Sequence, residues 1–277
     1  GARMSTEIIE KSCISKYEDE SRCEDGLFIS PGYIAVVDGV TSKGKYPWPG
    51  GRTSGRYARD ILLTALVTLP GDADARSAIG ILNAALAKAC APQREMLAKQ
   101  REDRPQAAVI LYSVRRREIW AFGDCQCLIG DQFYDHSKSI DNIVAEMRCF
   151  YNQTELLDGK TTEELLARDT GRAFILPLLR RQLVYANGEG PYAYDILDGF
   201  PIHPERIIVH PVPAGTQVVL ASDGYPQLKG SLEETEEVLS QVLTEDPLCI
   251  SLYKGTKGLV KGNRSFDDRT YVRFVAG

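Results

Sequence analysis

The chain has 277 residues, with 33 basic and 38 acidic side chains and a net charge of −5. Its 43% hydrophobic and 26% charged residues are typical of a soluble globular protein with a substantial core. The charge balance provides no broad positive field, which argues against a nucleic-acid-binding protein. No apolar stretch approaches the length of a bilayer span, so neither a membrane protein nor a membrane partner is expected.

The seven cysteines are scattered, include no CxxC pair and are odd in number. This spacing fits neither a disulfide framework nor a zinc-knuckle site, and it is typical of a protein from a reducing cytoplasm. Only three histidines are present and none is tied to a cysteine in sequence, so a Cys–His nucleophile is not favoured. Residues 1–4 look like a vector-derived remnant, and we expect one domain over residues 5–277.

The first half of the chain reads as a hairpin followed by two helices and further strands. The expected elements are a hairpin at 26–38, helices at 52–69 and 74–102, and strands at 107–114, 118–122 and 127–129. Either Asp72 or Asp74 is expected to cap the second helix.

The second half begins with a segment that is mostly helical from 139 to 186, with interruptions at 157–159 and near Gly171. The remaining expected elements are strands at 206–209 and 216–221, helices at 232–243 and 248–261, and a last strand at 271–275. Short hairpin turns join successive strands, whereas a parallel sheet would need long crossover connections. The chain is therefore predicted to be α+β, with antiparallel sheets covered by helices.

Acidic residues stand at the ends of several expected strands. Two apolar runs stop on an Asp-Gly pair, Asp38-Gly39 and Asp223-Gly224, which predicts a buried strand opening into a turn. Asp124 follows a third strand, and Asp267 precedes the last one. A strand of this kind can hold a carboxylate at the rim of a core, where hard metal ions are bound.

The first hairpin allows two registers. A three-residue loop with a left-handed Gly32 pairs Glu24 with Asp38, and a two-residue loop pairs Asp25 with Asp38 and sets Glu24 beside Gly39. We favour the three-residue loop, because its third position suits glycine. In either register two acids face each other with Cβ atoms about 4.5–5.5 Å apart. Such a pair needs a counterion, and Mg²⁺ or Mn²⁺ suits oxygen ligands.

Taken together, these motifs resemble the metal-dependent protein phosphatase family (protein phosphatase 2C-like, PPM type). The five matching segments follow the family's order along residues 13–275. They are Cys23-Glu24-Asp25, Val37-Asp38-Gly39, Phe122-Gly123-Asp124-Cys125, Ala221-Ser222-Asp223-Gly224 and Phe266-Asp267-Asp268-Arg269-Thr270.

The resemblance implies an αββα sandwich of two antiparallel sheets flanked by helix pairs, with a flap-like segment within about 139–204. It implies a hydrolase, most plausibly a serine/threonine protein phosphatase acting as a monomer on a phosphorylated protein. In that family, a water shared by two Mn²⁺ or Mg²⁺ ions attacks phosphorus in line. The residues matching the family's catalytic centre are Asp38 and Asp223.

The resemblance also implies a ligand set. Asp38 would bridge two ions, Glu24 and the Gly39 carbonyl would bind one of them, and Asp223 with Asp267 the other. A weaker third ion would use Asp124.

Two departures from the family pattern bear on activity. Val40 stands where many members have a histidine that could protonate the leaving group, and Glu20 where many have a phosphate-binding arginine. Arg22, Lys16 or Lys43 could hold the phosphate instead. The departures leave open a weak or inactive member that binds phosphoproteins as a regulator, and a plain interaction domain whose Asp-Gly pairs are only turns.

Overall fold

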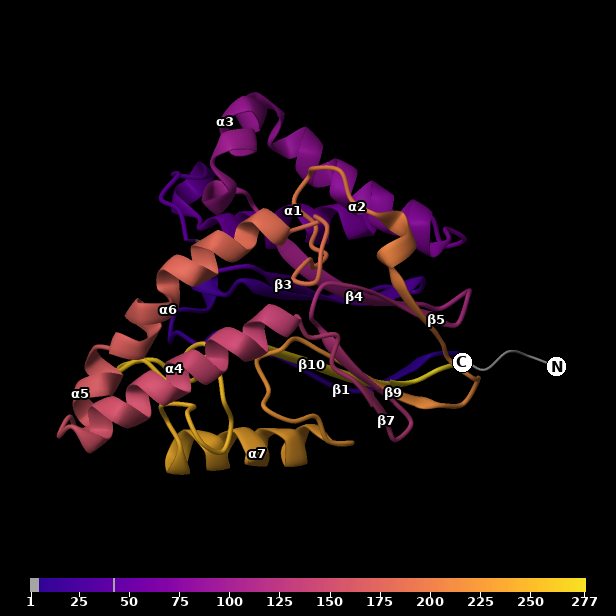
Figure 1. Ribbon diagram of the computed structural model, residues 1–277. Helices are drawn as coiled ribbons and strands as arrows, with labels where there is room; N and C mark the ends of the chain where they lie inside the picture. The colour runs from indigo at the N-terminus through magenta and orange to yellow at the C-terminus, as the bar shows by residue number, and fades with distance from the viewer. Residues whose placement is uncertain (1–4, 42) are drawn as a thin grey trace.

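The computed structural model describes residues 5–41 and 43–277, so the expected remnant at residues 1–4 lies outside the described residues. Two five-stranded antiparallel sheets pack face to face between helices, and the start of the first described strand lies on the same side as the C-terminus (Figure 1). The strand orders are β1-β10-β9-β6-β7 and β2-β3-β4-β5-β8, here called the β1 sheet and the β2 sheet. The expected αββα sandwich is confirmed.

The β1 sheet contains β1 (Glu7–Ile14), β10 (Arg269–Val275), β9 (Gln217–Ala221), β6 (Gln126–Ile129) and β7 (Gln132–Tyr134). The β2 sheet contains β2 (Asp25–Ile29), β3 (Tyr33–Gly39), β4 (Ala107–Ser113), β5 (Glu118–Phe122) and β8 (Ile208–Pro211). The helices are α1 (Ser54–Val67), α2 (Ala75–Ala89), α3 (Arg94–Lys99), α4 (Ser139–Leu157), α5 (Thr162–Ala167), α6 (Thr170–Arg181) and α7 (Leu232–Glu245).

Strand β3 is buried on both faces, which explains its continuous apolar sequence. Tyr33 and Val37 pack under α1 and α2, whereas Ile34 and Val36 pack against the β1 sheet. Because side chains alternate along a strand, Asp38 shares the face of Ile34 and Val36. Its carboxylate is therefore directed between the two sheets.

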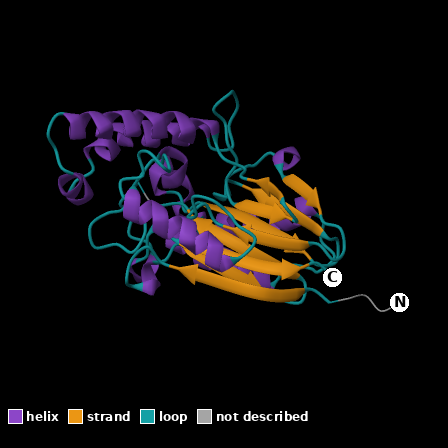
Figure 2. Cartoon of the chain, turned by 90° about the horizontal axis from the view of Figure 1, so that it is seen from below, coloured by secondary structure: helices purple, strands orange, loops and turns teal. Residues whose placement is uncertain are grey.

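The helices cover the sandwich unevenly. The α1–α2 pair covers the β2 sheet, and α7 packs on the outer face of the β1 sheet together with the loop that follows it. Helices α4 and α6 pack on each other at one end of the sandwich, on the left in Figure 1 and again to one side of the sheets in Figure 2. This end is where the candidate site lies.

Two expected helices are wrong. The helix predicted at 74–102 stops at Ala89, because Pro92 follows and cannot donate a backbone hydrogen bond. Asp74 is its cap, accepting from the Ser77 N–H at 2.8 Å. The interruption expected near Gly171 is confirmed, because α5 ends at Ala167 and α6 begins at Thr170, with Gly171 in the first turn of α6.

The helix predicted at 248–261 is an irregular loop. The Asp246 carboxylate accepts backbone hydrogen bonds at 2.9 Å from both Ser251 and Leu252, which turns the chain away from a helical path. This loop takes the place of a second helix on the β1 sheet. Strands β1 and β7 were not expected from the sequence.

The favoured register of the first hairpin is also wrong. Asp25 pairs with Asp38, so the loop contains only Pro31 and Gly32, as in the second register considered. The backbone of Gly32 lies outside the left-handed region. The Ser30 hydroxyl accepts from the Tyr33 N–H at 3.1 Å and holds the shorter turn. Within the described residues, no helix has the length and apolar character needed to cross a bilayer.

Candidate active site

Three aspartates from the ends of three strands form one cluster. Asp38 ends β3, Asp124 follows β5 and Asp223 follows β9, and one carboxylate oxygen of each lies within 4.8 Å of the others. Each side chain keeps some exposure toward a pocket that Asp267 also lines. Acids that are far apart in sequence thus meet where the strands of both sheets end.

Two glycines make this convergence possible. A Cβ on Gly39 would collide with the backbone carbonyl of Gly55, and one on Gly224 would collide with that of Asp268. Each Asp-Gly pair therefore brings its strand end against a neighbouring backbone segment. The close approach of two backbone segments therefore requires glycine at both positions, which a simple turn would not.

The cluster cannot hold its full negative charge alone. Burial, followed by the charges of Asp25 and Asp223, raises the pKa of Asp38 well above its ordinary value. Burial and the charge of Asp124 raise the pKa of Asp223 to about 8. Protons neutralise such a group when no metal does, and a divalent cation would replace them. A donor set made only of oxygen fits Mg²⁺ or Mn²⁺.

Asp25 is a further acid of this region that was not assigned to the site. It is buried, lies opposite Asp38 and accepts a 2.6 Å hydrogen bond from the Thr270 hydroxyl. Burial and the neighbouring Cys13 raise the pKa of its carboxyl. The two-residue hairpin loop is the sequence signal that could have identified it.

Glu24 lies beside the cluster, and its carboxylate accepts hydrogen bonds from two threonine side chains instead of from the aspartates. Its oxygens accept from the hydroxyls of Thr41 at 3.1 Å and Thr53 at 2.8 Å. Its backbone carbonyl accepts from the Gly39 N–H at 2.9 Å, so the two residues are neighbours across the hairpin. Burial raises the pKa of Glu24.

Asp267 and Asp268 play different parts. Asp267 lines the pocket 3.1 Å from the Lys257 ammonium. Burial alone would raise the pKa of Asp267, but Lys257, Lys16 and the Asp268 N–H together outweigh burial and hold that pKa below its ordinary value. Asp268 is buried and accepts from the backbone N–H groups of Lys16 at 2.8 Å and Glu24 at 2.9 Å. It fastens the N-terminal segment to the start of β10.

Among the described residues, four cations line the same pocket as the aspartates: Lys43, Lys138, Arg172 and Lys257. The Lys138 ammonium lies 3.8 Å from Asp124, and the Arg172 guanidinium donates to the Thr256 carbonyl at 3.0 Å. Of the four, only Lys43 was expected at the site. No local pattern marks the other three, since they reach the pocket from a loop, a helix and a second loop.

The other two candidate phosphate ligands lie outside this pocket's lining. Arg22 is exposed and places its guanidinium 3.6 Å from the centre of the Tyr17 ring. Lys16 is buried, and its ammonium lies 5.2 Å from the same ring centre. Lys43 does line the pocket, and burial with the charge of Arg172 lowers its pKa to about 7.

No family model matches the sequence, and no curated protein matches it either. Two solved structures resemble it over nearly the full length of both chains. One is the catalytic domain of the serine/threonine protein phosphatase PstP in complex with two manganese ions, at 14% identity and TM-score 0.50, covering 97% of this chain and 98% of that one. The other is PppA, a key regulatory component of T6SS in Pseudomonas aeruginosa, at 14% identity and TM-score 0.50, covering 99% of each chain. The protein therefore shares the two-sheet fold of PstP and PppA.

Proposed function

We propose that this protein is a Mn²⁺- or Mg²⁺-dependent phosphomonoesterase that acts on phosphoserine or phosphothreonine in proteins. The observation that carries the proposal is the cluster of Asp38, Asp124 and Asp223 in a pocket lined by four cations. Carboxylates that attract metal ions and cations that attract phosphate are the two requirements of metal-assisted phosphoryl transfer. The fold shared with PstP supports the same reading.

The proposed ligands of two ions are Asp38, Asp223, Asp267, Glu24 and the carbonyl of Gly39, with Asp124 serving a third. Glu24 stays in this set because its present partners are two neutral hydroxyls, which do not neutralise its charge. Bound divalent ions would acidify a water and neutralise charge on the phosphoryl oxygens.

The cations of the pocket would bind and orient the substrate phosphate. Arg172 presents a planar guanidinium that suits two phosphoryl oxygens, and Lys257 and Lys138 add point charges. These residues take the place of the arginine that the sequence lacks at position 20.

Lys43 would supply the proton that a histidine supplies elsewhere. Its Nζ donates to the Thr41 carbonyl at 3.2 Å, next to Val40 and the end of β3. A pKa of about 7 lets the ammonium give up a proton near neutral pH. In this proposal Nζ protonates the departing serine or threonine oxygen.

The proposal places the protein in a reducing compartment such as the cytoplasm. Its support is that all seven cysteines are free thiols, six of them buried. A monomeric state, and a single domain with a flap in the segment 139–204, remain predictions.

Hydrolysis of p-nitrophenyl phosphate and of a phosphothreonine peptide, with and without Mn²⁺, tests the proposal. We expect turnover that excess EDTA abolishes and that Asp38→Asn lowers at least a thousandfold. Asp131→Asn, a change of the same kind at an exposed turn, should retain full activity. Turnover that survives EDTA or Asp38→Asn would overturn the proposal. Metal binding without turnover would instead support a phosphoprotein-binding regulator.

A further inference from the structure

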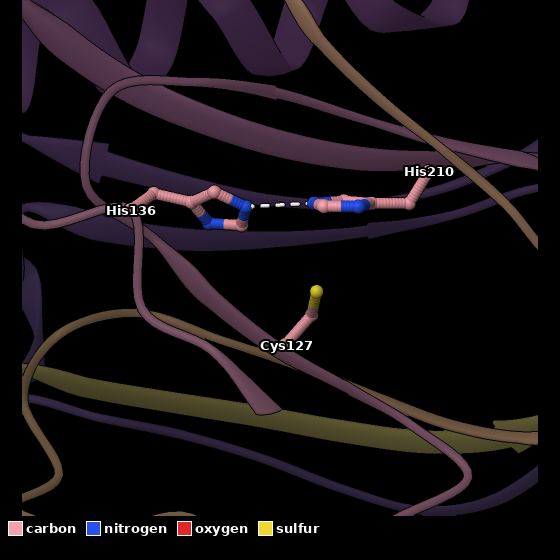
Figure 3. Close-up of side chains that lie close together, drawn as sticks. All are labelled: Cys127, His136 and His210. Carbon is pink, nitrogen blue, oxygen red and sulfur yellow. Dashed lines mark hydrogen bonds between the residues drawn. The ribbon is translucent and has the colours of Figure 1, made fainter. Parts of the chain in front are cut away.

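A second group of metal-binding side chains lies apart from the aspartates. Cys127 on β6, His136 in the loop after β7 and His210 on β8 each place one ligand atom within 4.8 Å of the other two. Figure 3 shows the nitrogen-bearing edges of the two imidazole rings pointing at each other, with the Cys127 sulfur directed toward this contact from one side. The group joins three segments, one from each sheet and one from a loop.

A hydrogen bond of Nδ1, the ring nitrogen directed away from the cluster, sets the orientation of His136. Its Nδ1 lies 2.6 Å from the Cys125 carbonyl, which can only accept a hydrogen bond. Nδ1 therefore carries a proton, and in the neutral ring the lone pair of Nε2 faces the cluster. A backbone carbonyl behind a histidine is the common arrangement that orients a metal ligand.

His210 brings a second nitrogen to the same point. Its Nε2 lies 2.9 Å from Nε2 of His136, and the Tyr134 ring packs on its face with centroids 4.2 Å apart. Since His136 accepts in this contact, the shared proton belongs to His210. If that proton leaves or moves to Nδ1 of His210, two lone pairs converge on one position.

Cys127 provides the third ligand from the interior. The residue is fully buried among the side chains between the sheets, and burial raises the pKa of its thiol to about 12. A free thiol in this environment is unreactive toward solvent oxidants. A bound metal ion would displace its proton.

We propose that Cys127, His136 and His210 form a binding site for Zn²⁺. Tetrahedral zinc with Zn–N near 2.05 Å and Zn–S near 2.3 Å holds its nitrogens roughly 3.3 Å apart and sulfur roughly 3.6 Å from each nitrogen. The two ring nitrogens, now 2.9 Å apart, would separate by a few tenths of an ångström, and the sulfur, within 4.8 Å of both, would complete the geometry by closing on the metal. The fourth position is left for water or another ligand.

The donor atoms separate this site from the carboxylate cluster. Imidazole and thiolate select zinc and similar transition metals, whereas Mg²⁺ and Mn²⁺ prefer carboxylate oxygen. On binding, two metal–nitrogen bonds and one metal–sulfur bond form, the thiol proton passes to solvent, and the His210 proton moves from Nε2 to Nδ1, with no change of oxidation state. The proposal does not depend on phosphatase activity.

Bound zinc would tie the edges of the two sheets together. In the part of the chain that the structure describes, β8 is an edge strand that pairs only with β5, and β6 lies near the corresponding edge of the β1 sheet. His136 also precedes Lys138 by two residues, so the metal would hold the loop that brings Lys138 to the aspartate pocket. We therefore expect the site to be structural.

Cobalt substitution tests the site directly. The full chain is reduced with a phosphine, stripped of metal, kept in excess Mg²⁺ to occupy oxygen sites, and titrated with Co²⁺. We expect one Co²⁺ per chain with a near-ultraviolet thiolate-to-cobalt band and the visible bands of tetrahedral cobalt. Cys127→Ser should lose the thiolate band, and Asp38→Asn should keep it. The third histidine, His203, offers a matched control, and His203→Ala should also keep the band.

Zinc binding gives a second readout that does not need the thiol variant to fold. Zn²⁺ at a hundredfold excess over its dissociation constant should raise Tm by roughly 5–10 °C in Mg²⁺ buffer. His210→Gln, at a partly exposed edge position, should abolish that shift, whereas His203→Ala retains it. The proposal is overturned if the wild-type chain shows no thiolate band, if the band survives Cys127→Ser, or if the zinc shift survives His210→Gln.

Discussion

Asp25 lies directly opposite Asp38 in the β2–β3 ladder, and the two carboxyl groups share one face of the sheet. Burial raises the pKa of both. Without a cation, protons must neutralise this pair and the neighbouring Asp223. The repulsion between these carboxylates therefore destabilises the strand ends, and a bound divalent cation would relieve it.

The first prediction concerns stability and pH. Because Asp223 has a folded pKa of about 8, well above that of an unfolded aspartate, the folded chain holds the extra proton between about pH 4 and pH 8. Stability of the metal-free protein should therefore fall as pH rises through this window. Thermal melts in EDTA should show the decline, and Asp223→Asn should reduce it. An unchanged slope in the variant would contradict this account.

Asp25→Asn should weaken metal binding without unfolding the protein. The amide keeps the shape of the side chain and can still accept the Thr270 hydrogen bond, but it removes one negative charge near Asp38. We expect the Kd for Mn²⁺ to rise roughly tenfold, about 1.4 kcal/mol, with an equal or higher Tm in EDTA. Calorimetry measures the first and thermal melting the second. An unchanged Kd would show that Asp25 does not contribute to the field at the site.

The acids of the pocket could be anticipated because each depends on local sequence. An apolar run that ends on Asp-Gly predicts the strand, the position where it ends and the carboxylate at that end, as at Asp38 and Asp223. The hairpin register could not be decided in this way. It depends on whether the Ser30 side chain holds the turn, which changes the partner of Asp38 from Glu24 to Asp25.

No local sequence pattern predicts the three pocket cations other than Lys43, or the cluster of Cys127, His136 and His210. Lys138, Arg172 and Lys257 reach the pocket from the loop before α4, from α6 and from a second loop, and their spacing in sequence carries no period. Likewise, Cys127 and His210 come from different sheets and meet only when the sandwich closes. Contacts between elements distant in sequence decide both cases.

Arg172→Ala should impair substrate binding more than folding. Loss of a charge-assisted contact to phosphate costs about 1.5–3 kcal/mol, so KM should rise roughly ten- to a hundredfold. Arg180→Ala provides the control, because Arg180 lies on the same helix and is exposed. Steady-state kinetics on p-nitrophenyl phosphate measures both. Equal effects of the two variants would remove Arg172 from the phosphate site.

Lys43→Met should stabilise the protein while lowering its activity. The folded pKa of Lys43 is about 7 and its unfolded value about 10.5, so unfolding takes up a proton between these pH values. The wild-type chain should therefore gain stability as pH rises from 7 to 10, and the variant should lack this gain. Thermal melts across that range measure the difference, and phosphatase assays measure the loss of the proton donor. A Tm below wild type at pH 7 would contradict the prediction.

Arg148 holds the loop that carries Thr256 and Lys257 to the pocket. It is fully buried in α4, contacts Asp169 at 2.8 Å, and donates to the carbonyls of Leu248 at 2.6 Å and Gly255 at 2.9 Å. Arg148→Met would leave these acceptors unpaired and should lower the free energy of unfolding by about 3–5 kcal/mol, measured in urea.

Arg148→Lys should recover little of that loss, because a single ammonium cannot span the acceptors that the guanidinium joins. Both variants should also raise KM, since Lys257 depends on the position of this loop. Arg181→Met, at the exposed end of α6, is the control and should change neither quantity. A stable Arg148→Met protein with normal KM would show that the loop keeps its course without the arginine. The Asp246 carboxylate, which accepts hydrogen bonds from the same loop, would then be sufficient to shape it.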